Sequence, residues 1–169
     1  MAVQCTSLKK TAVTIKPVPR METMPVSASQ KRLWFVQQLM PESSAYHMPL
    51  GLKLKGDVNR DWLEQSLRTV IGRHEALRTS FVQVDGELMQ SIHCGDDVSQ
   101  FSLAEYSTDE FSDLEAQRLS WIGETFDFSS PSLLRAYLIK HSEPAFELLR
   151  VVHPLIHDGI SIQHLQPEV

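Results

Sequence analysis

The sequence predicts one α+β domain in which helices pack on a sheet, and two observations lead to this prediction. The 169 residues are 42% apolar and 22% charged, a balance typical of a globular chain that buries a core. Apolar residues also recur with two different periods. The period is helical in 29–39, 60–74 and 107–122, whereas 48–55, 81–84, 87–92, 133–139 and 146–152 have the pattern or composition of strands.

The first element is expected only after a tail. Residues 1–24 are rich in Pro, Thr, Ser and Lys, which favours an extended, solvated inter-domain linker. Residues 25–169 are then the domain. Its first helix follows Ser29 and ends before Pro41, because a proline disfavours helical backbone at the residue before it.

The middle of the chain predicts a strand, a helix and a hairpin. Residues 48–55 alternate in polarity as a half-buried strand does. Asn59 is the expected N-cap of a helix over 60–74, with Trp62 on its apolar face. The dipeptide Asp85-Gly86 suits a type I′ turn between two strands.

In the last third, Ser107 and Glu110 are the expected capping box of a helix that runs to Ile122. The segments 133–139 and 146–152 are expected to pair as buried antiparallel strands. Ser161 is the expected N-cap of a last short helix. We assign Trp34, Trp62 and Trp121 to the core.

Charge and cysteine usage exclude several classes of function. The formal net charge is −5 and the basic residues are scattered, so nucleic acid is not an expected partner. No apolar run is long enough for a membrane span and no signal peptide is indicated, which predicts a cytoplasmic protein. Cys5 and Cys94 match no disulfide framework or zinc spacing. We therefore expect two free thiols, no bound metal and no directly bound cofactor.

Four separated segments together resemble one family. Residues 27–35 are similar to the motif SxAQxRLW, residues 73–81 match RHExLRTxF, and residues 126–136 are similar to FDL...PLLRA. Residues 153–159, His-Pro-Leu-Ile-His-Asp-Gly, resemble HHxxxDG with Pro154 in place of the second histidine. These are the motifs of nonribosomal peptide synthetase condensation domains.

The resemblance implies a fold and a reaction. The fold is the N-terminal lobe of a condensation domain, similar to chloramphenicol acetyltransferase and truncated after the HHxxxDG-like motif. The family forms amide bonds in secondary metabolite biosynthesis: an amine attacks a thioester, and both substrates are carried on phosphopantetheine arms. The implied partners are carrier protein domains and neighbouring synthetase modules. In the family, two such lobes form a tunnel in which the substrates meet.

The resemblance also implies roles for single residues. The family's second motif histidine acts as a general base or a positioning group, and Pro154 has no titratable group or backbone N–H with which to replace it. His153 matches the first, structural histidine. Asp158 is expected to form an ion pair with Arg73 or Arg78, and Gly159 to let the backbone approach the reacting centre.

These residues also allow other interpretations. His157 is not expected to replace the missing base, because its side chain leaves the backbone in another direction. A metal site at His153, His157 and His164 is also disfavoured. The charged cluster of Arg73, His74, Glu75 and Arg78 supports the site or is a solvated helix end.

We expect the chain to be inactive alone, since Pro154 and the absent second lobe both argue against catalysis. The alternative is a non-catalytic remnant or interaction module, which would self-associate through the exposed apolar face where the second lobe docks. A stand-alone acyltransferase completed by dimerisation would instead need a second copy to supply the missing wall.

Overall fold

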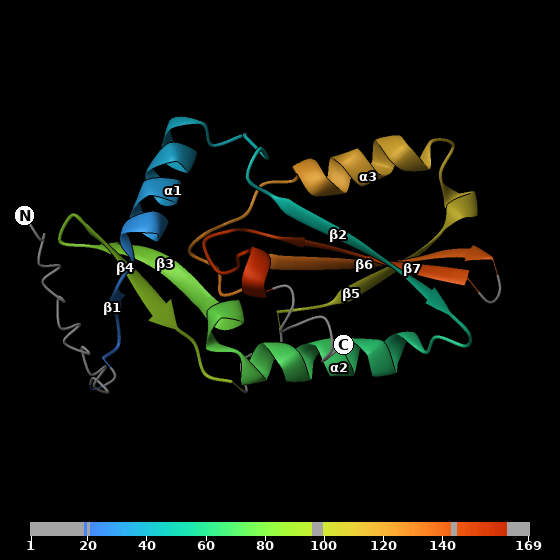
Figure 1. The fold of residues 1–169 in the computed structure, drawn as a ribbon, viewed down its shortest axis with the longest axis horizontal. Coiled ribbons are helices and arrows are strands. Elements are labelled where there is room, and N and C mark those ends of the chain that lie inside the picture. Colours follow the sequence, from blue (N-terminus) through green and yellow to red (C-terminus); the bar gives the residue numbers. More distant parts are fainter. Residues whose placement is uncertain (1–18, 20, 96–99, 143–144, 162–169) are drawn as a thin grey trace, which may run out of the picture.

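The computed structural model describes residue 19 and residues 21–95, 100–142 and 145–161. Within these residues it contains a three-stranded sheet, a four-stranded sheet and three α-helices (Figure 1). The elements in chain order are β1 (Met24–Pro25), α1 (Ala28–Leu39), β2 (Met48–Lys55), α2 (Arg60–Arg73), the 3-10 helix η1 (Glu75–Arg78), β3 (Thr79–Val84), β4 (Glu87–Ile92), β5 (Leu103–Ser107), the 3-10 helix η2 (Thr108–Glu110), α3 (Leu114–Gly123), β6 (Leu134–Ser142) and β7 (Ala145–Val152).

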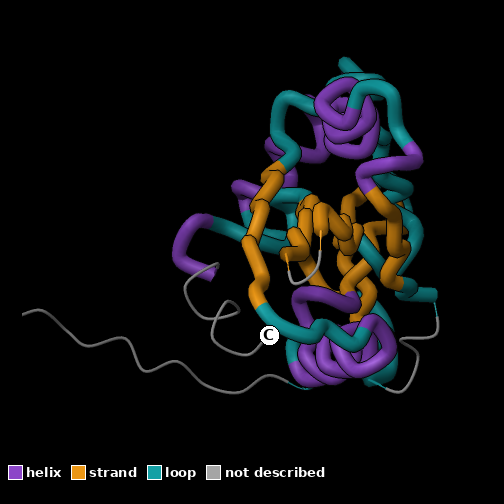
Figure 2. The backbone as a smooth tube through the Cα atoms, turned by 90° about the vertical axis from the view of Figure 1, so that its right-hand side faces the viewer, coloured by secondary structure: helices purple, strands orange, loops and turns teal. Residues whose placement is uncertain are grey.

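The larger sheet has the strand order β2-β7-β6-β5. The strands β2, β7 and β6 pair antiparallel, and β5 pairs parallel with β6. The helices α2 and α3 lie on opposite faces of this sheet (Figures 1 and 2). The central strands β6 and β7 are therefore buried on both faces, which agrees with their nearly continuous apolar sequences.

Two apolar clusters fill the spaces between these layers. On the α2 face, Leu67 and Ile71 pack against Leu138 and Leu148, together with Phe81 from the smaller sheet. On the α3 face, Trp121 packs against the outward side chains of β6 and β7, which include Tyr137, Ile139, Leu149 and Val151. Leu103, Leu133, Leu138, Ile139, Leu148 and Val151 have no exposed surface.

The smaller sheet has the order β1-β4-β3. Asp85 and Gly86 have φ angles of 52° and 81°, which confirms the predicted I′-type hairpin between β3 and β4. Met24 and Pro25 pair with Gln90 and Met89 of β4. Packed structure therefore already begins at Met24, the last residue of the predicted linker, while most of that linker lies outside the described residues.

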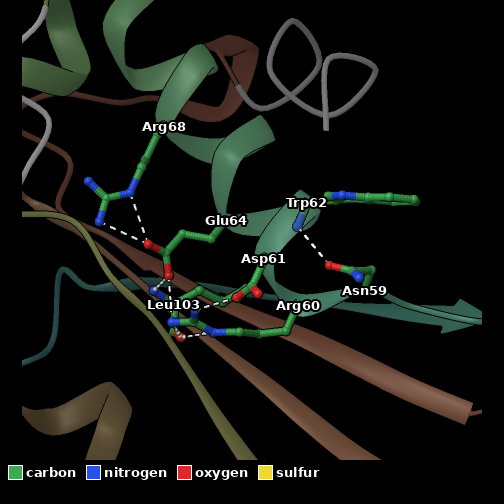
Figure 3. Close-up of polar contacts among 7 residues, drawn as sticks. All are labelled: Asn59, Arg60, Asp61, Trp62, Glu64, Arg68 and Leu103. Carbon is green, nitrogen blue, oxygen red and sulfur yellow. Dashed lines mark hydrogen bonds and ion pairs between the residues drawn. The ribbon is translucent and has the colours of Figure 1, made fainter.

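Side chains of α2 bind the backbone of the edge strand β5 (Figure 3). The Glu64 carboxylate accepts a hydrogen bond from the Leu103 N–H at 3.0 Å, and the Arg60 guanidinium donates to the Leu103 carbonyl at 2.7 and 3.1 Å. This Leu103 bond is the main reason that the pKa of Glu64 lies below its usual value. Arg60 and Arg68, on the same helix, each form an ion pair with this carboxylate. The hydrogen bonds of Glu64 and Arg60 to the Leu103 backbone attach the helix to the sheet edge.

The helix predicted over 29–39 is confirmed and begins one residue earlier, at Ala28, and the strand predicted over 48–55 is confirmed as well. The predicted Asn59 cap of α2 is also formed, since its side chain accepts from the Trp62 N–H. The core assignment of Trp62 is wrong, because its side chain is 73% exposed. It lies in the first turn of α2 and points away from the sheet (Figure 3). Leu67, Val70 and Ile71 are the buried residues of that helix.

The predicted helix from Ser107 to Ile122 is interrupted. Ser107 and Glu110 do form a capping box, but it caps η2, and α3 begins only after its own N-cap, Asp113. The strand β5 was not predicted. At five residues it is short, and its partner β6 lies about thirty residues further along the chain.

Candidate functional site

The HHxxxDG-like segment forms a loop directly after β7. Residues 154–156 form a turn, and residues 159–161 are helical. Asp158 begins this helical turn: its carboxylate accepts hydrogen bonds from the Ile160 and Ser161 N–H groups at 3.1 and 2.8 Å. The prediction that Ser161 is the N-cap is therefore wrong. Ser161 lies inside the turn, and Asp158 caps it.

His153 is buried, with 1% of its surface exposed. Its ring lies 4.8 Å from the ring of Phe128, 5.9 Å from Phe126 and 5.8 Å from His47. Its Nδ1 accepts a hydrogen bond from the Leu155 N–H at 3.2 Å, which places the proton on Nε2 in the neutral ring. Nε2 itself has no hydrogen-bond partner in the described part of the chain. The ring is held by packing and by the loop backbone.

Burial keeps both histidines of this cluster neutral. Desolvation lowers the pKa of His153 to about 4, with a smaller effect from His47. Desolvation also lowers the pKa of His47. His47 Nδ1 donates to the Ile122 carbonyl at 2.6 Å, so its tautomer is fixed as well. At neutral pH neither imidazole carries a charge.

Pro154 is half-buried and borders a groove of about 430 Å³ between the loop and the N-terminus of α1. Gln30 joins the two walls of this groove. Its side chain accepts from the Ser27 N–H at 2.8 Å and donates to the Leu155 carbonyl at 3.0 Å. No role was predicted for Gln30, although the spacing of Ser27 and Gln30 is that of a capping box.

The expected ion pair of Asp158 with an arginine is not formed among the described residues. Asp158 is exposed, and hydrogen bonds from the hydroxyl and backbone of Ser161 are the main reasons that its pKa is lowered. Arg78 donates instead to the carbonyls of Gly72 and His93 and lies 3.5 Å from Glu75. Arg78 therefore joins the end of α2 to the segment after β4. Arg73 is the last residue of α2, and its side chain is exposed.

The expected role of Gly159, to let the backbone approach the reacting centre, stays a prediction, and the described chain itself leaves open space beside this residue. A Cβ atom built on Gly159 would have no atom within 4 Å, and its φ angle is not in the left-handed region. No described part of the chain therefore requires glycine there.

His157 lies beneath the loop, with 7% of its surface exposed. It borders the groove beside Pro154. It also borders a second, smaller cavity, and Arg150 forms part of the wall of that cavity. Burial lowers the pKa of His157, and its Nδ1 has no hydrogen-bond partner among the described residues. Within the described part of the chain no group of three His, Cys, Asp or Glu residues is placed to hold a metal ion. His164 of the weighed metal site and Cys5 lie outside the described residues, and Cys94 is an exposed free thiol.

Comparison with protein families gives a match to the family described as "Condensation domain" over residues 20–168. Tyrocidine synthase 3 of Brevibacillus parabrevis is 37% identical over 155 residues, which are 91% of this chain and 2% of that protein. Bacitracin synthase 2 of Bacillus licheniformis is 40% identical over 147 residues, 86% of this chain and 5% of that protein. The chain thus spans a small part of each synthase.

Solved structures give the same fold. The starter condensation domain of rhizomide synthetase RzmA superposes with a TM-score of 0.75 at 23% identity, covering 86% of this chain and 37% of that chain. The first condensation domain of the calcium-dependent antibiotic synthetase gives a TM-score of 0.72 at 19% identity, covering 83% and 34%.

A four-stranded sheet between two helices, followed by an HHxxxDG-like loop, is thus the fold that this chain shares with solved condensation domains. The chain belongs to the condensation-domain family, and the predicted α+β fold is confirmed. Among the described residues, no helix is both long enough and apolar enough to span a membrane.

Proposed function

We propose that this chain is the N-terminal lobe of a condensation domain and that it supplies one wall of an amide-forming site in nonribosomal peptide synthesis. The family match over most of the chain supports this proposal. In the reaction, the amine nitrogen of one carrier-bound substrate attacks the thioester carbonyl of the other. An amide bond forms, a thiol leaves, and the amine proton must pass to a base.

The partners that follow from this reaction are carrier protein domains and neighbouring synthetase modules in the cytoplasm. Their phosphopantetheine arms would present the substrates, so the lobe needs no cofactor of its own. In this proposal the thioester enters the groove of about 430 Å³ beside Pro154.

We further propose that the chain does not catalyse this reaction by itself, and Pro154 is the observation on which this rests. The family's second motif histidine is replaced by a residue with no proton acceptor on its side chain. His153 is buried with its Nδ1 already engaged by Leu155. Asp158 uses its carboxylate to cap the next turn. His157 has its Nδ1 buried and its pKa lowered.

A condensation assay with two substrate-loaded carrier proteins tests this proposal. We expect no amide product from the 169-residue chain and none from Pro154→His, because on this proposal these residues supply only one wall of the site. Transplantation gives the matched control: an active two-lobe condensation domain that receives proline at its second motif histidine should lose most of its turnover. Product formation by the unmodified chain would refute the proposed inactivity.

The alternative, an interaction module, is favoured by one surface. Phe35, Leu39 and Met40, at the end of α1, are 58%, 67% and 51% exposed, and Tyr46 in the following loop is 39% exposed. Exposed apolar groups close together are typical of docking surfaces. On this alternative the chain self-associates in sedimentation experiments, Leu39→Gln weakens the association, and Leu119→Gln on α3 does not. A strictly monomeric chain would exclude self-association through this surface.

A further inference from the structure

A small cavity lies between α2 and the larger sheet, beneath the HHxxxDG-like loop. Its volume is about 30 Å³, and apolar side chains such as Leu50, Leu67, Val70 and Leu134 form most of its wall. The two polar side chains among its lining residues are Arg150 and His157. A space of this size holds one water molecule or one ion of similar size.

Arg150 is a buried cation in this wall. It lies on β7, opposite Leu50 of β2 and Ala136 of β6, and only 7% of its surface is exposed. Its Nε has no hydrogen-bond partner, and the guanidinium forms no ion pair with any described residue. Burial lowers the pKa of Arg150, but a guanidinium does not lose its proton in proteins. The positive charge therefore persists beside the apolar side chains of this wall.

A buried charge without a partner is strongly unfavourable. The side chains that α2, η1, β2 and β6 present to the cavity are Leu67, Val70, Ile71, Leu77, Met48, Leu50 and Leu134, and none of them is charged. Among the described residues no carboxylate therefore compensates the guanidinium, which favours an anion that enters the cavity. His157 contributes a second polar group to the cavity wall. Its buried Nδ1 also has no hydrogen-bond partner among the described residues.

We propose that this cavity binds one small monovalent anion of the size of chloride, held by the guanidinium of Arg150 and the imidazole of His157. The cation selects for negative charge, and the volume excludes polyatomic anions such as sulfate. The anion would connect β7 to the HHxxxDG-like loop, because Arg150 belongs to the strand and His157 to the loop. This proposal does not depend on the proposed function.

Thermal unfolding of the full chain tests the proposal. Sodium chloride replaces sodium gluconate at constant ionic strength, since gluconate is too large for the cavity. Above the dissociation constant, each tenfold rise in chloride should lower the unfolding equilibrium constant about tenfold. Arg150→Met should remove this dependence, and the matched control Arg32→Met, at an exposed arginine of α1, should retain it. Equal chloride responses in the unmodified chain and Arg150→Met would overturn the proposal, as would the absence of any response in the unmodified chain.

A second measurement does not depend on the stability of a variant. Crystals of the unmodified chain grown in sodium bromide should show an anomalous scattering peak between Arg150 and His157. Density for an ordinary water molecule at this place, without anomalous signal, would overturn the proposal.

Discussion

His153 and Pro154 are neighbours in the loop but have different surroundings. The His153 ring is enclosed by His47, Phe126 and Phe128, whereas Pro154 borders the groove. The His153 ring is fixed by its buried contacts, whereas Pro154 borders the groove that we propose for the thioester. A substitution at 154 can therefore remove chemistry while the loop keeps its shape.

The buried histidines predict a loss of stability in mild acid. Burial lowers the pKa of His153 from 6.5 to about 4, so the unfolded chain binds a proton more tightly than the folded chain. This contribution to stability is fully present above pH 6.5 and is lost as the pH falls toward 4. From pH 7 to 5 the free energy of unfolding should fall by about 2 kcal/mol for His153 alone. Urea denaturation at the two pH values measures it.

The control for this prediction removes the titrating group. His153→Leu should lose clearly less stability between pH 7 and 5 than the unmodified chain, whatever its absolute stability. Leu119→Gln, at an exposed site of α3 without a titratable group, should retain the full pH dependence. An unchanged dependence in His153→Leu would contradict the assignment.

Two glycines should respond in opposite ways to an added methyl group. A Cβ on Gly51 of β2 would lie 2.9 Å from Oε1 of Glu147, and this carboxylate accepts two hydrogen bonds from Arg118. Gly51→Ala should displace the buried ion pair and cost about 1–3 kcal/mol. Gly159→Ala meets no atom and should be neutral or slightly stabilising. Chemical denaturation compares the two, and equal effects would contradict this explanation.

At the scale of elements, the contact between α2 and β5 gives a further prediction. Glu64→Ala leaves the Leu103 N–H without its carboxylate acceptor and should cost about 1–3 kcal/mol. Hydrogen exchange at the Leu103 amide should accelerate. Asp61→Ala is the matched control, because Asp61 also pairs with Arg60 but is 81% exposed. Its expected cost is about 0–1 kcal/mol. If Leu103 exchanges equally fast in both variants, Glu64 does not protect this edge.

The elements predicted from the sequence are those whose signals are local. The Asn59 cap, the Asp85-Gly86 turn and the alternation in 48–55 each depend on neighbouring residues. The strand β5 and the division into two sheets depend on pairing between distant segments, which periodicity does not report. Trp62 was misplaced for a related reason, since the apolar face of a helix is wide and only packing decides which edge residue is covered.

The site could be predicted only in part for the same reason. The motif located the loop, and the absence of a base at Pro154 follows from residue type alone. The partners of Asp158, the burial of His157 and the unpaired charge of Arg150 arise where the loop, α2 and β7 meet. None of these contacts lies within a short stretch of sequence.

At the scale of the whole molecule, one core connects the two sheets. The cluster that contains Leu67 and Leu138 also contains Phe81 and Leu88 of the smaller sheet. The Phe81 N–H also donates to the Phe128 carbonyl at 2.7 Å. Within the residues that the structure describes, the smaller sheet therefore shares its core with the larger one.

This continuity predicts that the chain unfolds in a single transition. Trp121 lies in the cluster under α3, and Trp34 packs against the cluster shared by both sheets. Near-ultraviolet circular dichroism, which reports these aromatic residues, should therefore lose its signal at the same temperature as the far-ultraviolet signal of the backbone. The calorimetric enthalpy should equal the van't Hoff enthalpy. Leu138→Ala, at a site with no exposed surface, should lower both midpoints together at a cost of about 2–5 kcal/mol. Two separate transitions would mean that the sheets are stabilised independently, in contradiction to a shared core.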